Sequence, residues 1–269
     1  MIKLVATDID GTILKHNFEF NQEVKDCIKK LTDNGIKVVL VTGRMHKAAN
    51  YIAQELELET PIVSYQGGLI KHENKILYEK NLDPKCAKEI IHWAKKNNIH
   101  LNLYMNDKLY VEKDDPIIRR YTGEQRLNGF VVGAFEELRL KRINKILAIN
   151  FEDENKVTMW KDYLATKYED LHVVKSTPYF CEICHWHAKK SDAVNFLKDY
   201  WKLEREEIMT IGDQNNDLEL LAAGGIKVAM GNATEELKNI ADYVTDTVGN
   251  NGFVKAVEKF VRGYDEAVF

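Results

Sequence analysis

Three apolar runs, each ending in acidic, hydroxyl or amide residues, constrain the fold of this chain more than any other feature. They end in residues 8–12 (Asp-Ile-Asp-Gly-Thr), 42–44 (Thr-Gly-Arg) and 212–217 (Gly-Asp-Gln-Asn-Asn-Asp). Short runs that are apolar on both faces predict strands of a parallel sheet covered by helices. Because ligands bind at the carboxyl edge of such a sheet, we expect polar residues from distant parts of the chain to meet there.

The first run ends in two carboxylates, Asp8 and Asp10, placed two residues apart. On a strand their side chains would point to the same side. Two acids this close repel each other unless a cation or a shared proton lies between them. Gly11 permits a tight turn that brings backbone N–H groups near an anion. The pattern suits a phosphate group beside Mg2+, although an acidic pair before a glycine is also typical of an ordinary turn.

Strands and helices alternate in two parts of the chain, residues 1–81 and 186–269. This alternation predicts an α/β fold with a doubly wound (Rossmann-like) parallel-sheet core built from both parts. Residues 82–185 contain strands and a few helices without phosphate motifs, which predicts an inserted α+β cap domain. The predicted strands are residues 2–8, 36–41, 61–64, 69–71, 76–79, 101–105, 108–112, 145–151, 171–175, 179–184, 208–211, 227–230 and 243–244. The predicted helices are residues 21–34, 44–58, 85–97, 116–121, 153–167, 191–201, 218–223, 253–261 and one ending at residue 240 whose capping box pairs Asn232 with Glu235.

The charge and composition of the 269-residue chain exclude several classes of partner. A net charge of −4 without a basic patch argues against nucleic acid and against an anionic membrane surface. No apolar run approaches the roughly 18 residues that a membrane span needs. The four cysteines are too scattered for a disulfide framework, and no signal peptide is recognisable, so we expect a cytoplasmic protein. A monomer or small homo-oligomer is expected.

Together with Lys190, the three runs resemble the haloacid dehalogenase superfamily of phosphohydrolases. The first run fits its DxDGT motif, the second its TGR motif and the third its GDxxND motif. Residues 221–233 look like the Cof-type branch (subclass IIB-like), which carries a large C2 cap between the second and third motifs. The resemblance implies Mg2+-dependent hydrolysis of a small phosphorylated metabolite through an aspartyl-phosphate. It also implies a sugar phosphate, a nucleotide or a phosphorylated cofactor as the substrate class.

The two acids of the first motif receive different roles from this resemblance. Asp8 is the predicted nucleophile that attacks phosphorus. A purely metal-binding role for Asp8 is the alternative. Asp10 is the predicted general acid and base, and its backbone carbonyl is the family's metal ligand. The alternative for Asp10 is a residue that only forms the turn.

The remaining site residues would hold the phosphate and the metal. Thr42 is expected to donate a hydrogen bond to a phosphoryl oxygen, and Lys190 to neutralise charge on the transferring group. Three further residues are placed at the phosphate: Ile9, Gly43 and Asn216. Asp213 would complete the Mg2+ shell with Asp8 and Asp10.

Two of these assignments carry alternatives. Lys189 stands next to Lys190, and Ser191 occupies the position where the family usually has glycine, so either lysine could be the phosphate ligand. Asp217 would orient Lys190 or a metal-bound water, or it would simply be an acid at a helix N-terminus.

Three other patterns have competing interpretations. Residues 66–68 (Gln-Gly-Gly) replace the Asn-Gly that family members often have, so they either contact the substrate or only form a turn. Residues 181–187 combine two cysteines with His185 and His187, which suggests zinc. However, Cys181 and Cys184 would point to opposite faces of a strand, so a strand returning from the cap is the favoured interpretation. Aromatic residues of the cap are expected to pack in its core, with substrate stacking as the alternative.

Two other functions remain open on the same scaffold. A phosphomutase would return the phosphate to its substrate instead of releasing it. A catalytically weak sensor would only bind a phosphorylated ligand. A binding protein has no need of Asp10, so the intact acids favour the phosphatase.

Overall fold

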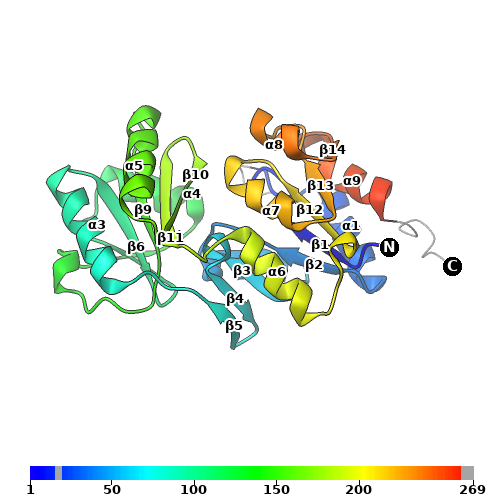
Figure 1. The fold of residues 1–269 in the computed structure, drawn as a ribbon, viewed down its shortest axis with the longest axis horizontal. Helices are drawn as coiled ribbons and strands as arrows, with labels where there is room; N and C mark the ends of the chain where they lie inside the picture. The colour runs from blue at the N-terminus through cyan, green and yellow to red at the C-terminus, as the bar shows by residue number, and fades with distance from the viewer. Residues whose placement is uncertain (16–19, 262–269) are drawn as a thin grey trace.

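The motif-bearing runs form three neighbouring strands of a parallel sheet in the computed structural model, which describes residues 1–15 and 20–261. This sheet has five strands in the order β14-β13-β12-β1-β2, and every neighbouring pair is parallel (Figure 1). The strands are β1 (Leu4–Thr7), β2 (Lys37–Leu40), β12 (Ile208–Gly212), β13 (Ile226–Ala229) and β14 (Tyr243–Val244). The sheet therefore joins strands from the beginning and the end of the chain, and the predicted α/β fold class is confirmed.

Helices cover both faces of this sheet because successive strand residues point to opposite sides. Val5 packs in one buried cluster with residues of α1, α2 and α9, whereas Leu4 and Ala6 pack in another with residues of α6 and α7. The helices of this half are α1 (Gln22–Asp33), α2 (His46–Glu55), α6 (Lys190–Tyr200), α7 (Leu218–Ala223), α8 (Glu235–Ile240) and α9 (Gly252–Phe260). Both faces of the central strands are thus covered by apolar side chains, and only the strand ends can contribute residues to a polar site.

A small antiparallel sheet follows the second motif. Its strands are β3 (Ile62–Ser64), β4 (Leu69–His72) and β5 (Lys75–Glu79), in that order, and a parallel bridge from Val41 to Val63 links β3 to the end of β2. A short 3-10 turn, Tyr65–Gly67, connects β3 to β4. Further 3-10 turns are Phe135–Glu137, Arg205–Glu207, Asn215–Asp217 and Val248–Asn250.

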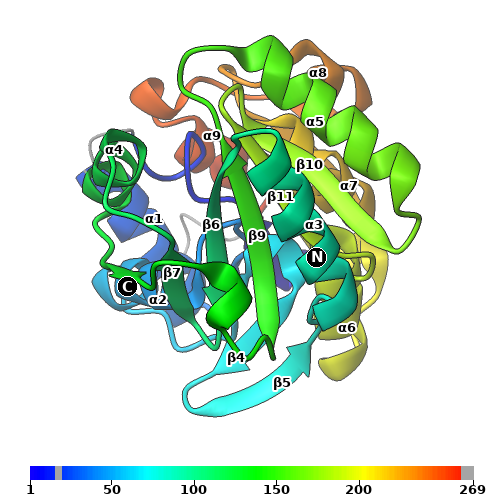
Figure 2. The same cartoon turned by 90° about the vertical axis from the view of Figure 1, so that its left-hand side faces the viewer.

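The segment between the two core parts folds around its own six-stranded sheet, in the order β10-β11-β9-β6-β7-β8. Helices α3 and α5 cover the face turned away from the parallel sheet (Figure 2). The opposite face carries Tyr104, Leu147 and Phe180, which pack with Met45 and Tyr65 of the other half. The elements are β6 (His100–Met105), β7 (Lys108–Val111), β8 (Gly129–Val131), β9 (Ile143–Ile149), β10 (Leu171–Thr177), β11 (Phe180–His185), α3 (Pro84–Lys96), α4 (Pro116–Gln125) and α5 (Glu154–Lys167).

The structure departs from the sequence-based expectations at four places. The helix predicted at residues 44–58 begins only at His46, because Arg44 stays in the loop where its backbone N–H donates to the Thr42 hydroxyl. The short helix predicted from Pro116 continues to Gln125. Strand β8 was not predicted, because its residues are all exposed and show no apolar alternation. The capping box predicted for Asn232 is wrong: Thr234 caps α8 instead.

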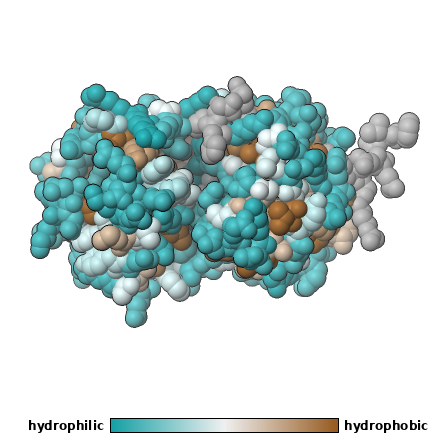
Figure 3. Space-filling model, turned by 90° about the horizontal axis from the view of Figure 1, so that it is seen from above, coloured by the Kyte–Doolittle hydropathy of each residue, from teal (hydrophilic) through white to brown (hydrophobic). Residues whose placement is uncertain are grey.

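Within residues 1–15 and 20–261, none of the helices combines the length and the apolar character needed to cross a bilayer. The face seen from above is mostly hydrophilic, with small separate hydrophobic areas (Figure 3).

Candidate active site

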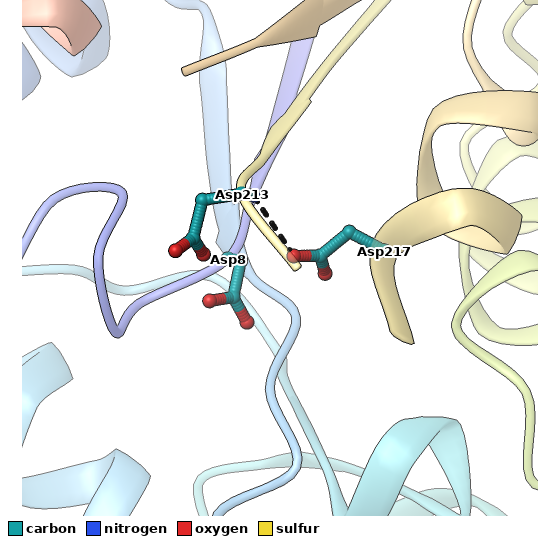
Figure 4. A group of neighbouring side chains, drawn as sticks. All are labelled: Asp8, Asp213 and Asp217. Atoms are coloured by element: carbon teal, nitrogen blue, oxygen red, sulfur yellow. Dashed lines mark hydrogen bonds between the residues drawn. The ribbon is translucent and has the colours of Figure 1, made fainter. Parts of the chain in front are cut away.

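Three aspartates converge where the central strands of the parallel sheet end. Asp8 follows β1, Asp213 follows β12, and Asp217 closes the 3-10 turn behind Asp213 (Figure 4). One carboxylate oxygen from each lies within 4.8 Å of the others, and all three residues are buried. Parallel strands β1 and β12 pair directly, so the fold brings together acids that are distant in the sequence. The structure places Asp8 and Asp213 as the sequence predicted, at one edge of the sheet.

Lys190 supplies the positive charge of this cluster. It is the first residue of α6 and is 1% exposed. Its Nζ donates to Asp8 Oδ1 and to Asp217 Oδ1, both at 2.6 Å. The neighbouring Lys189 points elsewhere, with its Nζ 3.7 Å from Glu219 and 3.4 Å from the centre of the Trp186 ring. Geometry therefore brings Lys190, and not Lys189, to the acids.

Asp217 orients this lysine and has little capacity left for other ligands. Its Oδ1 accepts from Lys190, and its Oδ2 accepts from the backbone N–H groups of Asp213 and Gln214 at 3.0 and 3.1 Å. A Cβ on Gly212 would lie 2.6 Å from the Asp217 Cβ, so only glycine leaves room for this acid. Of the roles considered for Asp217, this geometry matches the orientation of Lys190.

Burial and crowding change the acidity of the cluster. Burial raises the pKa of Asp8 to about 7; Lys190 opposes this shift, and Asp217 and Asp10 add to it. Burial, followed by the charges of Asp217 and Asp8, raises the pKa of Asp213 to about 8. Burial alone would lower the pKa of Lys190, but its two aspartate partners raise it above its ordinary value. A single ammonium thus faces three acids, and a dication would relieve the excess negative charge.

Asp10 lies beyond the end of β1 and is not part of the carboxylate cluster. The buried guanidinium of Arg44 holds it with two hydrogen bonds, from Nε at 2.7 Å and from Nη2 at 2.5 Å. The Asp10 side chain is 48% exposed, whereas the Arg44 side chain is 7% exposed. This bidentate pair fixes the direction of the Asp10 carboxylate. Sequence reasoning missed this role of Arg44, although the residue belongs to the second motif.

The loop after β2 presents the second motif beside the acids. Thr42 is buried, and its hydroxyl accepts from the Arg44 N–H at 3.2 Å. A Cβ on Gly43 would collide with the Gln66 amide nitrogen, so the Gln66 side chain packs directly against this glycine. The side chain of Ile9 lies in the hydrophobic core. Ile9 can therefore take part in the site only through its backbone.

Asn216 and Asn232 complete the rim of the site. The amide of Asn216 donates to Gln66 Oε1 at 3.2 Å. Asn232 donates to the Gly11 carbonyl at 2.9 Å and to Asp213 Oδ2 at 3.3 Å. This use of its side chain explains why Asn232 does not cap α8.

Two charged residues of the six-stranded sheet reach the second-motif loop. Lys145 of β9 donates to the Gly43 carbonyl and to Glu182 of β11, both at 2.7 Å. Their side chains are 3% and 5% exposed. Neither residue is among those predicted from the sequence. The available signal is a charged side chain, Lys145 or Glu182, within each of two largely apolar strands, which is rare unless the charges are paired.

The cysteine- and histidine-containing stretch does not form a metal site. Cys181 packs with the cluster beneath α3 and α5, and His187 contacts Asp192 at 3.1 Å. Across residues 1–15 and 20–261, the acids Asp8, Asp213 and Asp217 are the sole group with metal-site spacing. The strand interpretation of this stretch is confirmed by β11. Most cap aromatics are likewise in core clusters, including Trp93, Tyr104 and Tyr121.

The donor set at the sheet edge fits a hard cation. Asp8 and Asp213 provide carboxylate oxygens, and the raised pKa values of both show that uncompensated negative charge is costly there. A Cβ on Gly11 would collide with the Asp213 carboxylate, so the loop that carries the Asp10 carbonyl lies against this acid. The groups that could hold Mg2+ are the carboxylates of Asp8 and Asp213 and the backbone carbonyl of Asp10.

A doubly covered parallel sheet with a buried Asp–Lys–Asp cluster at its carboxyl edge, facing an inserted α+β segment, defines a protein of the phosphohydrolase class. The chain belongs to the haloacid dehalogenase-like hydrolases, whose family model matches residues 5–257. The predicted superfamily and enzyme class are thereby confirmed.

Individual relatives extend over nearly the whole chain. Phosphatase YwpJ of Bacillus subtilis is 29% identical and covers 93% of this chain and 97% of its own length. The 5-amino-6-(5-phospho-D-ribitylamino)uracil phosphatase YitU of the same organism is 28% identical, with 97% of both chains covered. A crystal structure of a haloacid dehalogenase-like hydrolase from Bacteroides thetaiotaomicron superposes with a TM-score of 0.85 at 27% identity, covering 96% of this chain and 99% of that one.

Proposed function

We propose that this enzyme is a cytoplasmic, Mg2+-dependent phosphatase that hydrolyses a small phosphorylated metabolite through a phosphoryl group on Asp8. The observation that carries the proposal is the buried contact of Lys190 with Asp8 and Asp217 beside Asp213. Relatives named as phosphatases support it, and one of them is named for a phosphorylated ribityl compound. The absence of disulfides among the four cysteines agrees with a reducing compartment.

Asp8 and Lys190 would carry out the phosphoryl transfer. A carboxylate oxygen of Asp8 attacks phosphorus and forms an acyl phosphate, which divides one displacement into two. Lys190 neutralises charge that spreads over the phosphoryl oxygens, and Thr42 donates its hydroxyl to one of them. The Gly43 N–H and the Ile9 backbone add polar contacts, and Asn216 reaches the phosphate from the opposite loop.

Asp10 would move the protons of both steps. It protonates the oxygen of the departing alcohol, and it then accepts a proton from the water that attacks the acyl phosphate. Arg44 aims its carboxylate at these two positions. Mg2+ held by Asp8, Asp213 and the Asp10 carbonyl would supply further compensation for the negative charge of the phosphate.

Residues 82–185 would act as a cap that closes over the sheet edge and excludes water. The contact of Lys145 with Gly43 and the shared apolar cluster around Tyr65 and Tyr104 support this role. Residues 1–81 and 186–269 would form the catalytic core.

Release of phosphate tests the proposal. We expect p-nitrophenyl phosphate and several metabolite monophosphates to be hydrolysed with Mg2+, and hydrolysis to stop in EDTA and resume when Mg2+ is restored. A mutase would release no inorganic phosphate from its substrate, and a sensor would bind without turnover. Full activity in chelator contradicts the metal dependence.

The variant Asp10→Asn tests the covalent step. It should lose about 10²–10⁴-fold in rate with an alkyl phosphate, because the alkoxide must be protonated. The loss should be smaller with an aryl phosphate, whose leaving group is already a stable anion. The phosphoryl group should then accumulate on Asp8, since the attacking water lacks its base. Rapid quench with labelled aryl phosphate and mass spectrometry of the Asp8 peptide detects it. An Asp8 that is never labelled in either protein excludes the intermediate.

A further inference from the structure

The turn between β3 and β4 holds a strained backbone at the edge of the active site. Tyr65, Gln66 and Gly67 have φ values of 53°, 58° and 101° in succession, and the first two are not glycine. All three are buried. Left-handed conformations at large side chains cost free energy and are retained where the surroundings demand a particular arrangement. This conformation therefore indicates that the turn has a functional role in addition to connecting β3 and β4.

The strain places the Gln66 amide between two loops of the site. Its Oε1 accepts from Asn216, and its Nε2 lies against Gly43. Gln66 is 0% exposed, yet its Nε2 has no hydrogen-bond partner among the residues that the structure describes. A buried N–H group without a partner lowers stability. A donor of this kind next to Gly43 indicates a ligand that supplies an acceptor.

An acceptor oxygen of the six-stranded sheet borders the Gln66 amide. Glu182 Oε1 lies 3.1 Å from the position that a Cβ on Gly43 would occupy, and Gln66 Nε2 lies still closer to the same position. A phosphate oxygen without a proton has no hydrogen to donate to this carboxylate. A hydroxyl would be favoured, because its oxygen can accept from Gln66 while its hydrogen is donated to Glu182.

The charges around this space are already balanced. Lys145 pairs with Glu182, and Arg44 pairs with Asp10. Each of these two pairs is neutral overall, so neither would attract a second anionic group such as another phosphate or a carboxylate. The space therefore suits a neutral, hydroxylated part of the substrate next to the phosphate ester.

We propose that Gln66 is a specificity-determining residue that, with Glu182, reads a hydroxyl group of the alcohol from which phosphate is removed. The preferred substrates are then monophosphates of neutral polyhydroxylated alcohols. This proposal rests on the proposed phosphatase function and deepens it.

The test compares ribitol 5-phosphate with pentyl phosphate, which share a five-carbon chain and differ in the hydroxyl groups. The wild type should have a kcat/KM for ribitol 5-phosphate at least about 10-fold higher. Gln66→Asn keeps an amide and tolerates the left-handed backbone, but it is one methylene shorter. Gln66→Glu keeps the shape and replaces the donor by an acceptor. Both variants should lose about 10–100-fold with ribitol 5-phosphate and clearly less with pentyl phosphate, so that the preference disappears.

Two controls separate this role from others. The inhibition constant of inorganic phosphate should change less than about 3-fold in Gln66→Asn, which adds no charge, and Gln54→Asn on the exposed face of α2 should behave as the wild type. Thermal melting checks that each variant is folded. Equal losses on both esters with weaker phosphate inhibition would assign Gln66 to the phosphate and overturn the proposal, as would a wild type without preference. If the wild type releases no phosphate from any ester, including p-nitrophenyl phosphate, the proposed function itself fails.

Discussion

Lys189 is the N-cap residue of α6 and Lys190 is its first residue, and this difference in position determines which lysine contacts the acids. Replacing Lys190 by Met leaves Asp217 buried without its counter-ion. We expect Lys190→Met to lower the free energy of unfolding by about 3–5 kcal/mol and to abolish phosphate release. Lys189→Met is the matched control and should cost less than about 1 kcal/mol, because its contacts are nearer the surface. Urea unfolding at pH 7 measures both, and similar effects at the two positions would contradict the assignment.

The raised pKa values of Asp8 and Asp213 predict how pH and Mg2+ act together. In the metal-free folded protein these acids hold protons up to about pH 7 and 8, whereas in the unfolded chain they lose them near 3.8. The folded state therefore binds more protons between these limits, so stability falls as pH rises through that window. The proposed Mg2+ would bind the ionised acids and should raise the melting temperature more at pH 8 than at pH 6. Scanning fluorimetry at both pH values tests this, and an equal or reversed shift would contradict it.

The turn Tyr65–Gly67 influences the site in two ways: through the Gln66 side chain and through the packing of its backbone against the start of α6. A Cβ on Gly67 would collide with the Lys189 carbonyl and lie 3.0 Å from the Lys190 nitrogen, so the turn packs against the start of α6. Gly67→Ala also puts alanine at a φ of 101°. We expect it to lower the free energy of unfolding by about 2 kcal/mol or more and to reduce activity by displacing Lys190.

A glycine in a helix provides the matched control for this variant. Gly123 lies in α4, and a Cβ there would meet no atom within 4 Å. Gly123→Ala should stabilise the protein by about 0.5–1 kcal/mol without changing activity. Chemical denaturation and phosphate release distinguish the two, and an unaffected Gly67→Ala would show that α6 does not depend on the turn.

The elements that were predictable from the sequence are those whose signals are local. Apolar runs located the core strands, and polar residues at their ends located Asp8 and Asp213. The contacts of Arg44 with Asp10 and of Lys145 with Glu182 and Gly43 were not predictable, because they depend on how separate segments pack. Asn232 shows the limit of a local rule: its spacing fits a capping box, but its side chain binds Gly11 and Asp213 instead.

At the scale of the whole molecule, residues 82–185 meet the rest of the described chain through several polar contacts and one apolar cluster. Lys145 binds the Gly43 carbonyl, the Tyr65 hydroxyl donates to Asp107, and Tyr104 packs against Tyr65 with ring centres 5.9 Å apart. Lys145→Met removes the polar contact with Gly43 and leaves Glu182 buried without its partner, which favours a more open arrangement. We expect a larger radius of gyration by X-ray scattering, reversed in part by a bound phosphate analogue, whereas the exposed Lys141→Met should match the wild type. An unchanged scattering curve would indicate that the remaining polar and apolar contacts hold the closed state without Lys145.

The central position of β1 has a consequence for how the polypeptide acquires its structure. Leu4 pairs with Lys37 on one side and with Ile208 on the other. During synthesis, the edge of β1 that pairs with β12 therefore stays unpaired until residues 208–212 have been made. The six-stranded sheet can form earlier, because its strands are closer to one another in the sequence. Closing so long a loop is slow, and an open strand edge invites wrong pairing. The catalytic centre, assembled across the pairing of β1 with β12, would therefore form only after residues 208–217 have been synthesised.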